Sequence, residues 1–339
     1  MSSTSQPTDF SDLYTDLMNR TREDTSVAAT VTQAKRYINI ALYDMHLGQG
    51  EQFRWAERRA QLLTRQRYTT GTLFISKGST SVVGAATAWD APDDFSELPL
   101  QSGDKVIVSG TNEVYQISNV VGANVADFTS KFVGDDVSGA SYVSFTDEYA
   151  LASDFLRPID QQSFDDNLSI DLVGRTEFRR RYPRNSVPGT IKSATLIDLG
   201  PSGSTARRQR IRFSPPPQNA ELIPYTYVTS NLVTASDGTA QTNLSADADE
   251  PIVPLQYRHA IVYGALATWY RDKKDDARAG SAAADYARVM TRIMSDNEIG
   301  GARAQIRPRI TTYARSARRP WRGGGGRYDT GGRFDRFEA

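Results

Sequence analysis

Apolar residues between Pro254 and Asn297 recur at steps of three and four, the spacing of one face of an α-helix. The polar run 271–276 divides the stretch, so the pattern predicts two helices joined there. The first helix has a wide stripe of apolar residues, which predicts that it is buried on more than one side. The second helix has a narrower apolar stripe, called its seam. The stripe comprises Leu255, Val262, Leu266 and Trp269, widened by Ile261, Tyr263 and Tyr270, and the seam comprises Ala283, Tyr286, Met290 and Ile293.

Two more helices are predicted near the N-terminus. A short one has Asp9 or Ser11 as its N-cap, and a longer one starts after Thr25 or Ser26 and stops at a pair of glycines. Each has one apolar face that requires a partner. The faces comprise Phe10, Leu13, Tyr14 and Leu17 in the first helix and Val27, Val31, Ala34, Ile38, Ala41 and Met45 in the second, which ends before Gly48 and Gly50.

A third amphipathic stretch, residues 53–67, predicts another helix, with its arginines mostly away from the apolar face. Most of the chain between the two ends is strand-like, so the apolar faces at the ends are natural partners for each other. We therefore expect the N- and C-terminal helices to pack as one antiparallel bundle, with Ile38, Leu42, Val262 and Leu266 buried. The apolar face of the third stretch comprises Phe53, Ala56, Ala60 and Leu63.

The pattern changes at Thr69 to short β-branched runs separated by glycine-rich turns. Two hairpins are predicted, with turns at 77–79 and 110–112, and two short runs follow them. This spacing is typical of a small barrel or sandwich, residues 68–147, inserted after the helices. The strand-like runs are 70–84, 104–121, 125–132 and 140–145.

A second β-rich region follows. It includes a short basic helix at 176–182 and a polar loop at 230–251. The triple proline 215–217 predicts a polyproline-like turn, because proline fixes its own φ and restricts the residue before it. The predicted strands are 169–173, 190–199, 207–213 and 221–228.

These elements predict an α+β protein: a bundle made from both chain ends, β-rich insertions and an extended C-terminal tail. The predicted divisions are residues 1–67 for the N-terminal helices, 68–147 for the β module, 148–253 for the second β-rich region, 254–297 for the closing helical pair and 298–339 for the tail.

Charge is distributed unevenly along the 339 residues, although 40 Lys and Arg balance 40 Asp and Glu. From Arg303 onward there are ten arginines and three acids, so the preceding 302 residues carry 30 basic and 37 acidic groups.

The chain contains no cysteine, which excludes a disulfide framework, a cysteine zinc site and a thiol nucleophile. No apolar run approaches a membrane span and the N-terminus lacks a signal-peptide pattern, so we expect a cytoplasmic product without a membrane anchor.

Catalytic motifs are absent from the sequence. His46 is predicted to end a helix, where a cation suits the carbonyl end of the dipole, and His259 lies on the first closing helix. Two isolated imidazoles make neither a triad nor a metal site, and no metalloprotease, nucleophile-elbow or phosphate-loop pattern occurs. We therefore predict no catalytic residue, no cofactor and no metal, and expect a structural protein.

Clusters of like charge have simpler interpretations. Adjacent acids on a strand or helix point apart, so the paired aspartates are expected in solvated turns or caps rather than as an acid–base pair. The loop 247–250 is a candidate metal site only through its three acids. The run 179–181 is expected to be a solvated helix face. The paired aspartates are Asp135–Asp136, Asp165–Asp166 and Asp275–Asp276.

The ordered series of elements resembles the head-to-tail adaptor, or connector, proteins of tailed bacteriophages, which form a ring beneath the portal. The resemblance covers about residues 26 to 297 and carries no catalytic residue. After the N-terminal helices it rests on TTGTLFISKGSTSVVGAATAW (69–89), LQSGDKVIVSGTNEVYQISNV (100–120), DEYALASDF (147–155), IRFSPPPQNAELIPYTYV (211–228) and PIVPLQYRHAIVYGALATWY (251–270).

This resemblance implies a homo-oligomeric ring, commonly of twelve copies, at the head–tail junction of a virion assembled in the host cytoplasm. The implied partners are the portal protein and tail or nozzle proteins, while DNA passes through the channel without specific binding. The bundle would lie near the portal and the β parts would extend outward or tailward. A ring also requires complementary surfaces on the two flanks of each subunit. Acidic walls would let DNA slide past, which is a further hypothesis.

The tail lies outside this resemblance. Its composition is linker-like, with a glycine run at 323–326 that neither follows a strand nor opens a helix, so it is not a nucleotide site. Its arginines and aromatic residues suit an arm that binds an acidic surface. We expect the portal as its first partner, a neighbouring subunit as its second and DNA as its third. The predicted contact residues are Arg303, Arg307, Arg309, Tyr313, Arg315, Arg318, Arg319, Trp321, Arg322, Arg327, Tyr328, Arg333, Phe334, Arg336 and Phe337.

Two other classes of function remain open from the sequence. A nucleic-acid-binding protein could act through the Arg/Gly/aromatic tail, by charge attraction and base stacking. An enzyme or carbohydrate-binding protein could be built on the β region. A ring of about a dozen copies would favour the adaptor, whereas a steep salt dependence of nucleic-acid affinity would favour the second class.

Overall fold

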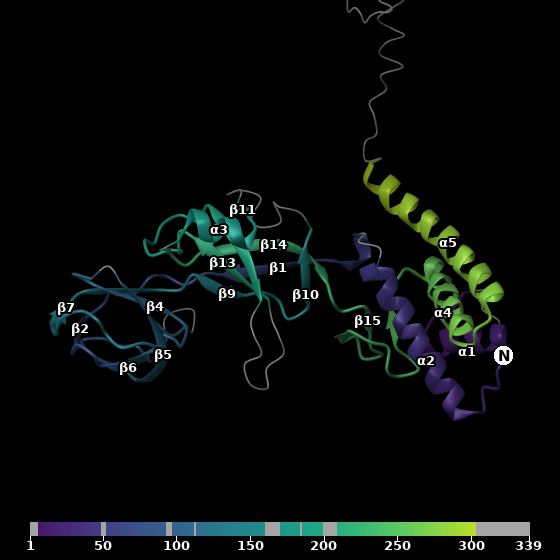
Figure 1. The fold of residues 1–339 in the computed structure, drawn as a ribbon, viewed down its shortest axis with the longest axis horizontal. Helices are drawn as coiled ribbons and strands as arrows, with labels where there is room; N and C mark the ends of the chain where they lie inside the picture. The colour runs from purple at the N-terminus through teal and green to yellow at the C-terminus, as the bar shows by residue number, and fades with distance from the viewer. Residues whose placement is uncertain are drawn as a thin grey trace, which may run out of the picture. The chain divides into compact units, whose positions relative to one another are not determined.

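The computed structural model divides the chain into two compact units: residues 1–54 with 244–339, and residues 55–243. The first is helical and the second consists mainly of strands, which confirms the predicted α+β class (Figure 1). The residues described here are 6–48, 52–92, 97–111, 113–159, 170–183, 185–198 and 209–302.

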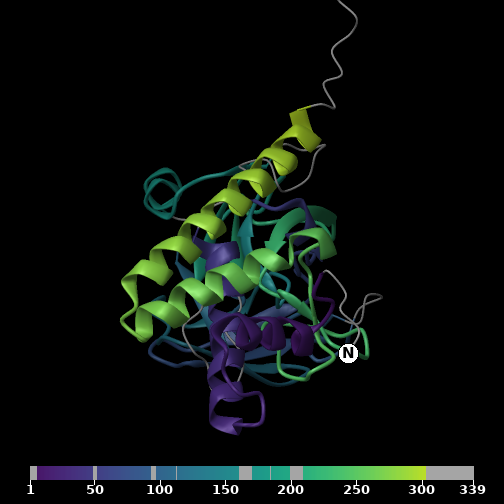
Figure 2. The same cartoon turned by 90° about the vertical axis from the view of Figure 1, so that its right-hand side faces the viewer.

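The helical unit joins the two ends of the chain. Helix α4 contacts α1, α2 and α5, and α4 and α5 lie side by side in both views (Figures 1 and 2). The predicted burial of Ile38, Leu42, Val262 and Leu266 is confirmed, since each is at most 5% exposed. The helices are α1 (Phe10–Thr21), α2 (Ala28–Tyr43) with a π-helical end (Asp44–Gly48), a 3-10 turn (Leu255–Tyr257), α4 (His259–Asp272) and α5 (Asp276–Ala302).

Helix boundaries follow the sequence signals only in part. Asp9 caps α1 as predicted, because its carboxylate accepts the backbone N–H of Asp12 at 2.9 Å. The cap predicted for α2 is wrong: Val27 occupies the N-cap and provides no side-chain bond. The nearby carboxylate of Asp24 instead accepts the N–H of Ser26 at 2.8 Å, which forms a local turn before the helix.

The joint between α4 and α5 lies within the predicted run 271–276. Asp275 accepts the N–H of Arg278 at 3.1 Å and so caps the first turn of α5, as expected for this acidic pair. One stripe position is wrong, because Leu255 is 43% exposed. It lies in the 3-10 turn after Pro254, and α4 begins only at His259, so Leu255 does not share the phase of the later apolar residues.

The helix predicted at residues 53–67 is also wrong. A 3-10 turn (Arg54–Ala56) leads into strand β1 (Glu57–Leu63), which pairs antiparallel with β14 (Leu222–Thr229). The stretch alternates polar and apolar residues from Arg59 to Leu62, and Ala60 and Leu62 pack against a β core. Strand pairing with an apolar neighbour outweighs the weak helical spacing here.

The predicted β module is a seven-stranded sheet in the order β7-β2-β3-β6-β5-β4-β8. Its two outermost strands, β7 and β8, are separated by Ser141 alone, so the chain crosses from one edge of the sheet to the other and the sheet curls around a common interior (Figure 1). Both predicted hairpins are confirmed as β2–β3 and β4–β5. The strands are β2 (Thr72–Ile75), β3 (Ser81–Ala85), β4 (Lys105–Val108), β5 (Val114–Gly122), β6 (Val125–Phe128), β7 (Val137–Ala140) and β8 (Tyr142–Phe145).

The module encloses its own core and its ends meet. Buried residues of the other six strands form one apolar cluster with Trp89, and Val137 and Ala140 of β7 pack against it. The indole N–H of Trp89 donates to the Tyr142 hydroxyl at 2.8 Å. Tyr68 and Ser144 exchange two backbone hydrogen bonds, each of 2.8 Å. The two ends of the module therefore lie side by side, as an insertion requires.

The second β-rich region packs two sheets around another core. One sheet has the order β1-β14-β10 and the other β11-β12-β13-β9, and residues of both contribute to one apolar cluster. The short basic helix predicted at 176–182 is α3 (Arg175–Arg181), which contacts β12. The strands are β9 (Glu148–Ala150), β10 (Phe155–Pro158), β11 (Asp171–Leu172), β12 (Ser193–Asp198) and β13 (Gln209–Ser214), and the loop 230–251 contains β15 (Val233–Thr234), β16 (Ala240–Gln241) and β17 (Glu250–Pro251).

Candidate functional site

The fifteen tail residues predicted to bind the portal lie between Arg303 and Phe337, outside the described residues. The described part of the chain instead concentrates buried charge where the β module joins the two-sheet region. Five residues form this group, here called the joint cluster: Arg65, Asp104, Lys105, Asp147 and Arg212.

Asp104 lies in the turn before β4 and is 3% exposed. The guanidinium of Arg65, which follows β1, donates two parallel hydrogen bonds to its carboxylate, at 3.2 and 2.5 Å. The hydroxyl of Thr146 and the N–H of Gln101 donate to the same carboxylate. This fork geometry holds β4 of the module against the strand that precedes the module.

Asp147 lies between β8 and β9 and is 2% exposed. Its two oxygens accept the ammonium of Lys105 at 2.7 and 2.9 Å, and one of them also accepts Nε of Arg212 at 2.7 Å. The amide of Asn185 donates at 3.3 Å. One carboxylate therefore connects β4 of the module with β13 of the second region.

The hydroxyl of Tyr149 connects the backbone of Arg65 with that of Thr146, the residue before Asp147. Burial raises the pKa of its hydroxyl, so it stays protonated and donates to the carbonyl of Thr146 at 3.2 Å. The same oxygen accepts the backbone N–H of Arg65 at 3.1 Å. Each buried charge in the cluster has a partner of opposite sign, which is the condition for burying charge without a large penalty.

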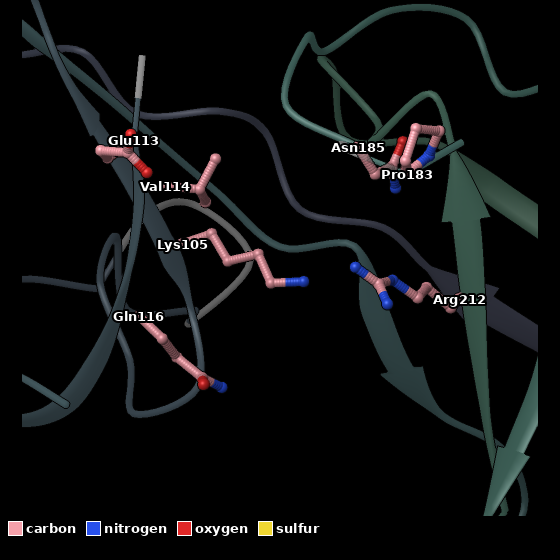
Figure 3. Close-up of a pocket in the computed structure, with 7 residues that line it drawn as sticks. All are labelled: Lys105, Glu113, Val114, Gln116, Pro183, Asn185 and Arg212. Atoms are coloured by element: carbon pink, nitrogen blue, oxygen red, sulfur yellow. The ribbon is translucent and has the colours of Figure 1, made fainter. Parts of the chain in front are cut away.

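A pocket of about 330 Å³ opens beside the joint cluster. Figure 3 shows Lys105 and Arg212 pointing toward each other across it from opposite sides, with Gln116 on the side of the module and Asn185 on the other. Both cations bind Asp147, so their charges are compensated within the protein, and among the described residues the one carboxylate that lines the pocket is that of Glu113. The shared contacts with Asp147 tie together the two β bodies on either side of the pocket.

The helical unit carries a groove of about 240 Å³ on α4 and α5. The guanidinium of Arg20 lies 5.2 Å from the ring centre of Tyr263, and that of Arg278 lies 5.7 Å from the ring centre of Tyr270. These cation–π contacts occupy both arginines within the unit. The groove is therefore a surface feature without an uncompensated charge.

The two histidines have different outcomes: His259 lies on α4 as predicted, whereas His46 is not the cation at a helix end that the sequence suggested. His46 does end α2, but it is 5% exposed, and burial lowers its pKa even though its Nδ1 lies 3.0 Å from the carbonyl of Leu42. It is therefore a neutral core residue rather than a cation at the helix end. Burial and the charge of Arg292 likewise lower the pKa of His259, which packs edge-on against Tyr263.

The acid-rich loop 247–250 uses its carboxylates within the protein. Asp247 pairs with Lys35 at 2.6 Å, and Glu250 pairs with Arg258 at 3.4 Å. Asp249 accepts the N–H groups of Ser245 and Ala246, both at 2.8 Å. These partners give the loop a structural role.

The two remaining acidic pairs have separate outcomes. Asp135 and Asp136 both contact Lys77, in the turn-like role expected for them. Residues 165–166 lie outside the described residues.

The joint cluster was missed by sequence reasoning for a physical reason. Arg65 lies 39 residues before Asp104, and Asp147 lies 65 residues before Arg212, so no local spacing reveals either pair. The only available signal was position, since Arg65 and Asp147 stand near the two borders of the predicted module. Charged residues at such borders are common enough that this signal alone predicts no contact.

A sequence model of the SU10 adaptor protein family matches residues 135–312. The match covers just over half of the chain and includes parts of both compact units. No curated protein matches the chain. No helix in the described ranges carries an apolar stretch sufficient to cross a bilayer. The chain therefore belongs to the SU10 adaptor protein family, a family of structural adaptors of bacteriophage particles.

Proposed function

We propose that the protein joins the portal to the tail as an oligomeric ring around the DNA channel, at the head–tail junction of the virion. The observation that carries this proposal is the adaptor-family match from residue 135 to residue 312, which runs from the β module through both closing helices. The role is structural rather than catalytic, and it requires no cofactor. Its partners would be further copies of the chain, the portal and tail proteins.

The construction of the joint cluster supports this role. Paired buried charges hold the β module in a defined position on the two-sheet region, because each carboxylate accepts bonds from both bodies. A subunit that positions neighbours on two sides benefits from such a fixed connection. Ring closure additionally requires complementary surfaces on its two flanks.

The charge distribution supports passage of DNA through such a ring. Outside the basic tail the chain carries 37 acidic and 30 basic groups. Affinity for DNA comes mainly from neutralised phosphates, so an acidic body would hold DNA weakly. The helical unit, which we propose forms an antiparallel bundle, would face the portal, and the arginine-rich tail would bind an acidic surface of the portal.

The proposal is tested by co-sedimentation with the portal protein of the same phage. We expect the full chain to sediment with portal rings in a density gradient, and not with the portal of an unrelated phage. Free chain that remains at the top of the gradient at every ratio tested would contradict the proposal.

The nucleic-acid alternative predicts a different result in the same preparation. The tail has ten arginines interleaved with aromatic residues, so tight binding to DNA that falls steeply with salt would favour it. We expect weak binding of duplex DNA at physiological salt, because the body of the chain repels phosphate.

A further inference from the structure

We propose that a second pocket, formed by α3 with strands β12 and β13, binds an acidic segment of a neighbouring protein. This α3 pocket has a volume of about 240 Å³. The proposal rests on the adaptor role in one respect: an adaptor contacts other proteins of the virion. It does not require that the chain forms a ring or binds the portal. The lining consists of Arg175, Phe178 and Arg179 from α3, Thr195 and Ile197 from β12, Arg212 from β13 and Glu148 from β9.

Strand alternation explains how the pocket is built. Ile211 and Phe213 of β13 point into the sandwich core, so Arg212 between them faces the opposite side of the sheet. Helix α3 packs on that side and inserts Phe178, which is only 2% exposed. The pocket thus combines an apolar floor, made by Phe178 and Ile197, with a rim of arginines.

The lining carries excess positive charge. Three arginines face one glutamate, and Arg212 is already bound to Asp147 at 2.7 Å. Among the described residues, Arg175 and Arg179 have no ion-pair partner. Their neighbours differ, because Arg180 and Arg181 share the carboxylate of Glu177 at 3.3 and 3.2 Å. Of the four arginines of α3, the two on the pocket side therefore have no ion-pair partner in the described part of the chain.

The two arginines are unfavourable as a pair, although Arg179 by itself lies in the last turn of α3, where a cation suits the helix dipole. Arg175 is the first residue of α3, where the positive end of the helix dipole disfavours a cation. Arg179 follows four residues later, and like charges at this spacing repel. A pair that breaks two local rules and has no ion-pair partner among the described residues is expected where a ligand supplies the compensation.

The chemistry of the lining selects the partner. Arginine forks suit carboxylates, and the apolar floor suits an aromatic or aliphatic side chain next to them. Glu148 within the lining disfavours a continuous run of phosphates, so an acidic peptide fits better than nucleic acid. A second copy of this chain is one source, because its body carries more acidic than basic groups.

The test uses the full chain and a fluorescent peptide with glutamates flanking a phenylalanine, followed by fluorescence anisotropy. The double variant Arg175→Ala/Arg179→Ala removes the two uncompensated arginines. The matched control, Arg180→Ala/Arg181→Ala, removes the same charge from the same helix outside the pocket. We expect affinity to fall about ten-fold in the first variant and less than about two-fold in the control, as loss of charge-assisted bonds predicts.

Three results would overturn the proposal: equal losses in both variants, equal affinity for a peptide with glutamine in place of glutamate, or binding of duplex DNA but not of the acidic peptide. Circular dichroism establishes that each variant is folded. If the double variant does not fold, Arg179→Ala alone replaces it, because alanine has the highest helix propensity and Arg179 lies within α3. It should then weaken binding about three-fold, and unchanged affinity would count against the site.

Discussion

Single residues in this protein are most consequential where charge is buried. Asp147 is 2% exposed and binds both Lys105 and Arg212, whereas the pair between Asp135 and Lys77 has side chains that are 97% and 63% exposed. Both are Asp–cation pairs in the same β-rich unit. The two pairs differ in solvent access: if one partner is removed, water can solvate the remaining charge in the exposed pair but not in the buried one.

The substitution Asp147→Ala should therefore lower the free energy of unfolding of the β-rich unit by about 3–5 kcal/mol, because it leaves Lys105 and Arg212 without their shared counterion. The matched control Asp135→Ala should cost about 1 kcal/mol or less. Urea titration followed by tryptophan fluorescence measures both. Similar small losses in the two variants would show that the joint cluster does not stabilise the unit.

His46 should make stability depend on pH. Burial lowers its pKa in the folded protein, whereas the unfolded chain takes up a proton below the ordinary value of about 6.5. Below that pH the unfolded state binds more protons, so stability should fall as pH falls, by at most about 1.4 kcal/mol per pH unit for this group. Unfolding free energies measured between about pH 7.5 and pH 5 should fall less steeply in His46→Phe than in the wild type. An unchanged slope in His46→Phe would contradict burial of a neutral ring.

At the scale of elements, some helices and hairpins of this chain could be predicted from sequence patterns alone. Strong helical periodicity predicted α2, α4 and α5, and glycine turns between β-branched runs predicted the hairpins of the module. The helix predicted at residues 53–67 was wrong because arginine and alanine have high helix propensity. In the structure, pairing with seven residues of β14 makes this stretch the strand β1. Leu255 was misplaced because one 3-10 turn shifts the phase of a helix.

The candidate sites could not be predicted to the same degree. The partners of the joint cluster are far apart in sequence. The pairing of β4 with β8 and of β13 with β9 brings Lys105 and Arg212 to Asp147, which lies between β8 and β9. The run 179–181 was visible as a basic helix face, but its division into paired and unpaired arginines depends on which face of α3 covers β12. The charged residues can therefore be identified from the sequence, whereas their partners depend on the tertiary packing.

Replacing residues 69–143 by a short Gly/Ser linker tests whether the module is a separate insertion. Tyr68 and Ser144 already exchange two hydrogen bonds, so a short linker spans the gap without strain. We expect the helical unit to keep a cooperative thermal transition in far-ultraviolet circular dichroism, with the full chain as reference. The remaining strands should lose stability, because Arg65 and Asp147 lose partners. If the variant shows no cooperative transition, the module is not a separate insertion that the helical unit can fold without.

At the scale of the whole molecule, the main asymmetry is an acidic body followed by a basic tail. The 37 residues from Arg303 to Ala339 could reach roughly 120 Å if fully extended, enough to run along a neighbouring subunit. We expect deletion of these residues to leave the body folded and able to form any ring, but to weaken binding to the portal. Binding is measured by surface plasmon resonance over a range of salt, and unchanged affinity at every salt concentration would show that the tail is not a portal-binding arm.

The most direct measurement is native mass spectrometry of the purified chain, alone and after mixing with the portal protein of the same phage. We expect a closed assembly of about twelve copies, formed either by the chain alone or on the portal, because a heterologous contact that closes by rotation gives one defined stoichiometry. A chain that stays monomeric in both preparations, or forms open assemblies without a preferred copy number, would contradict the ring adaptor.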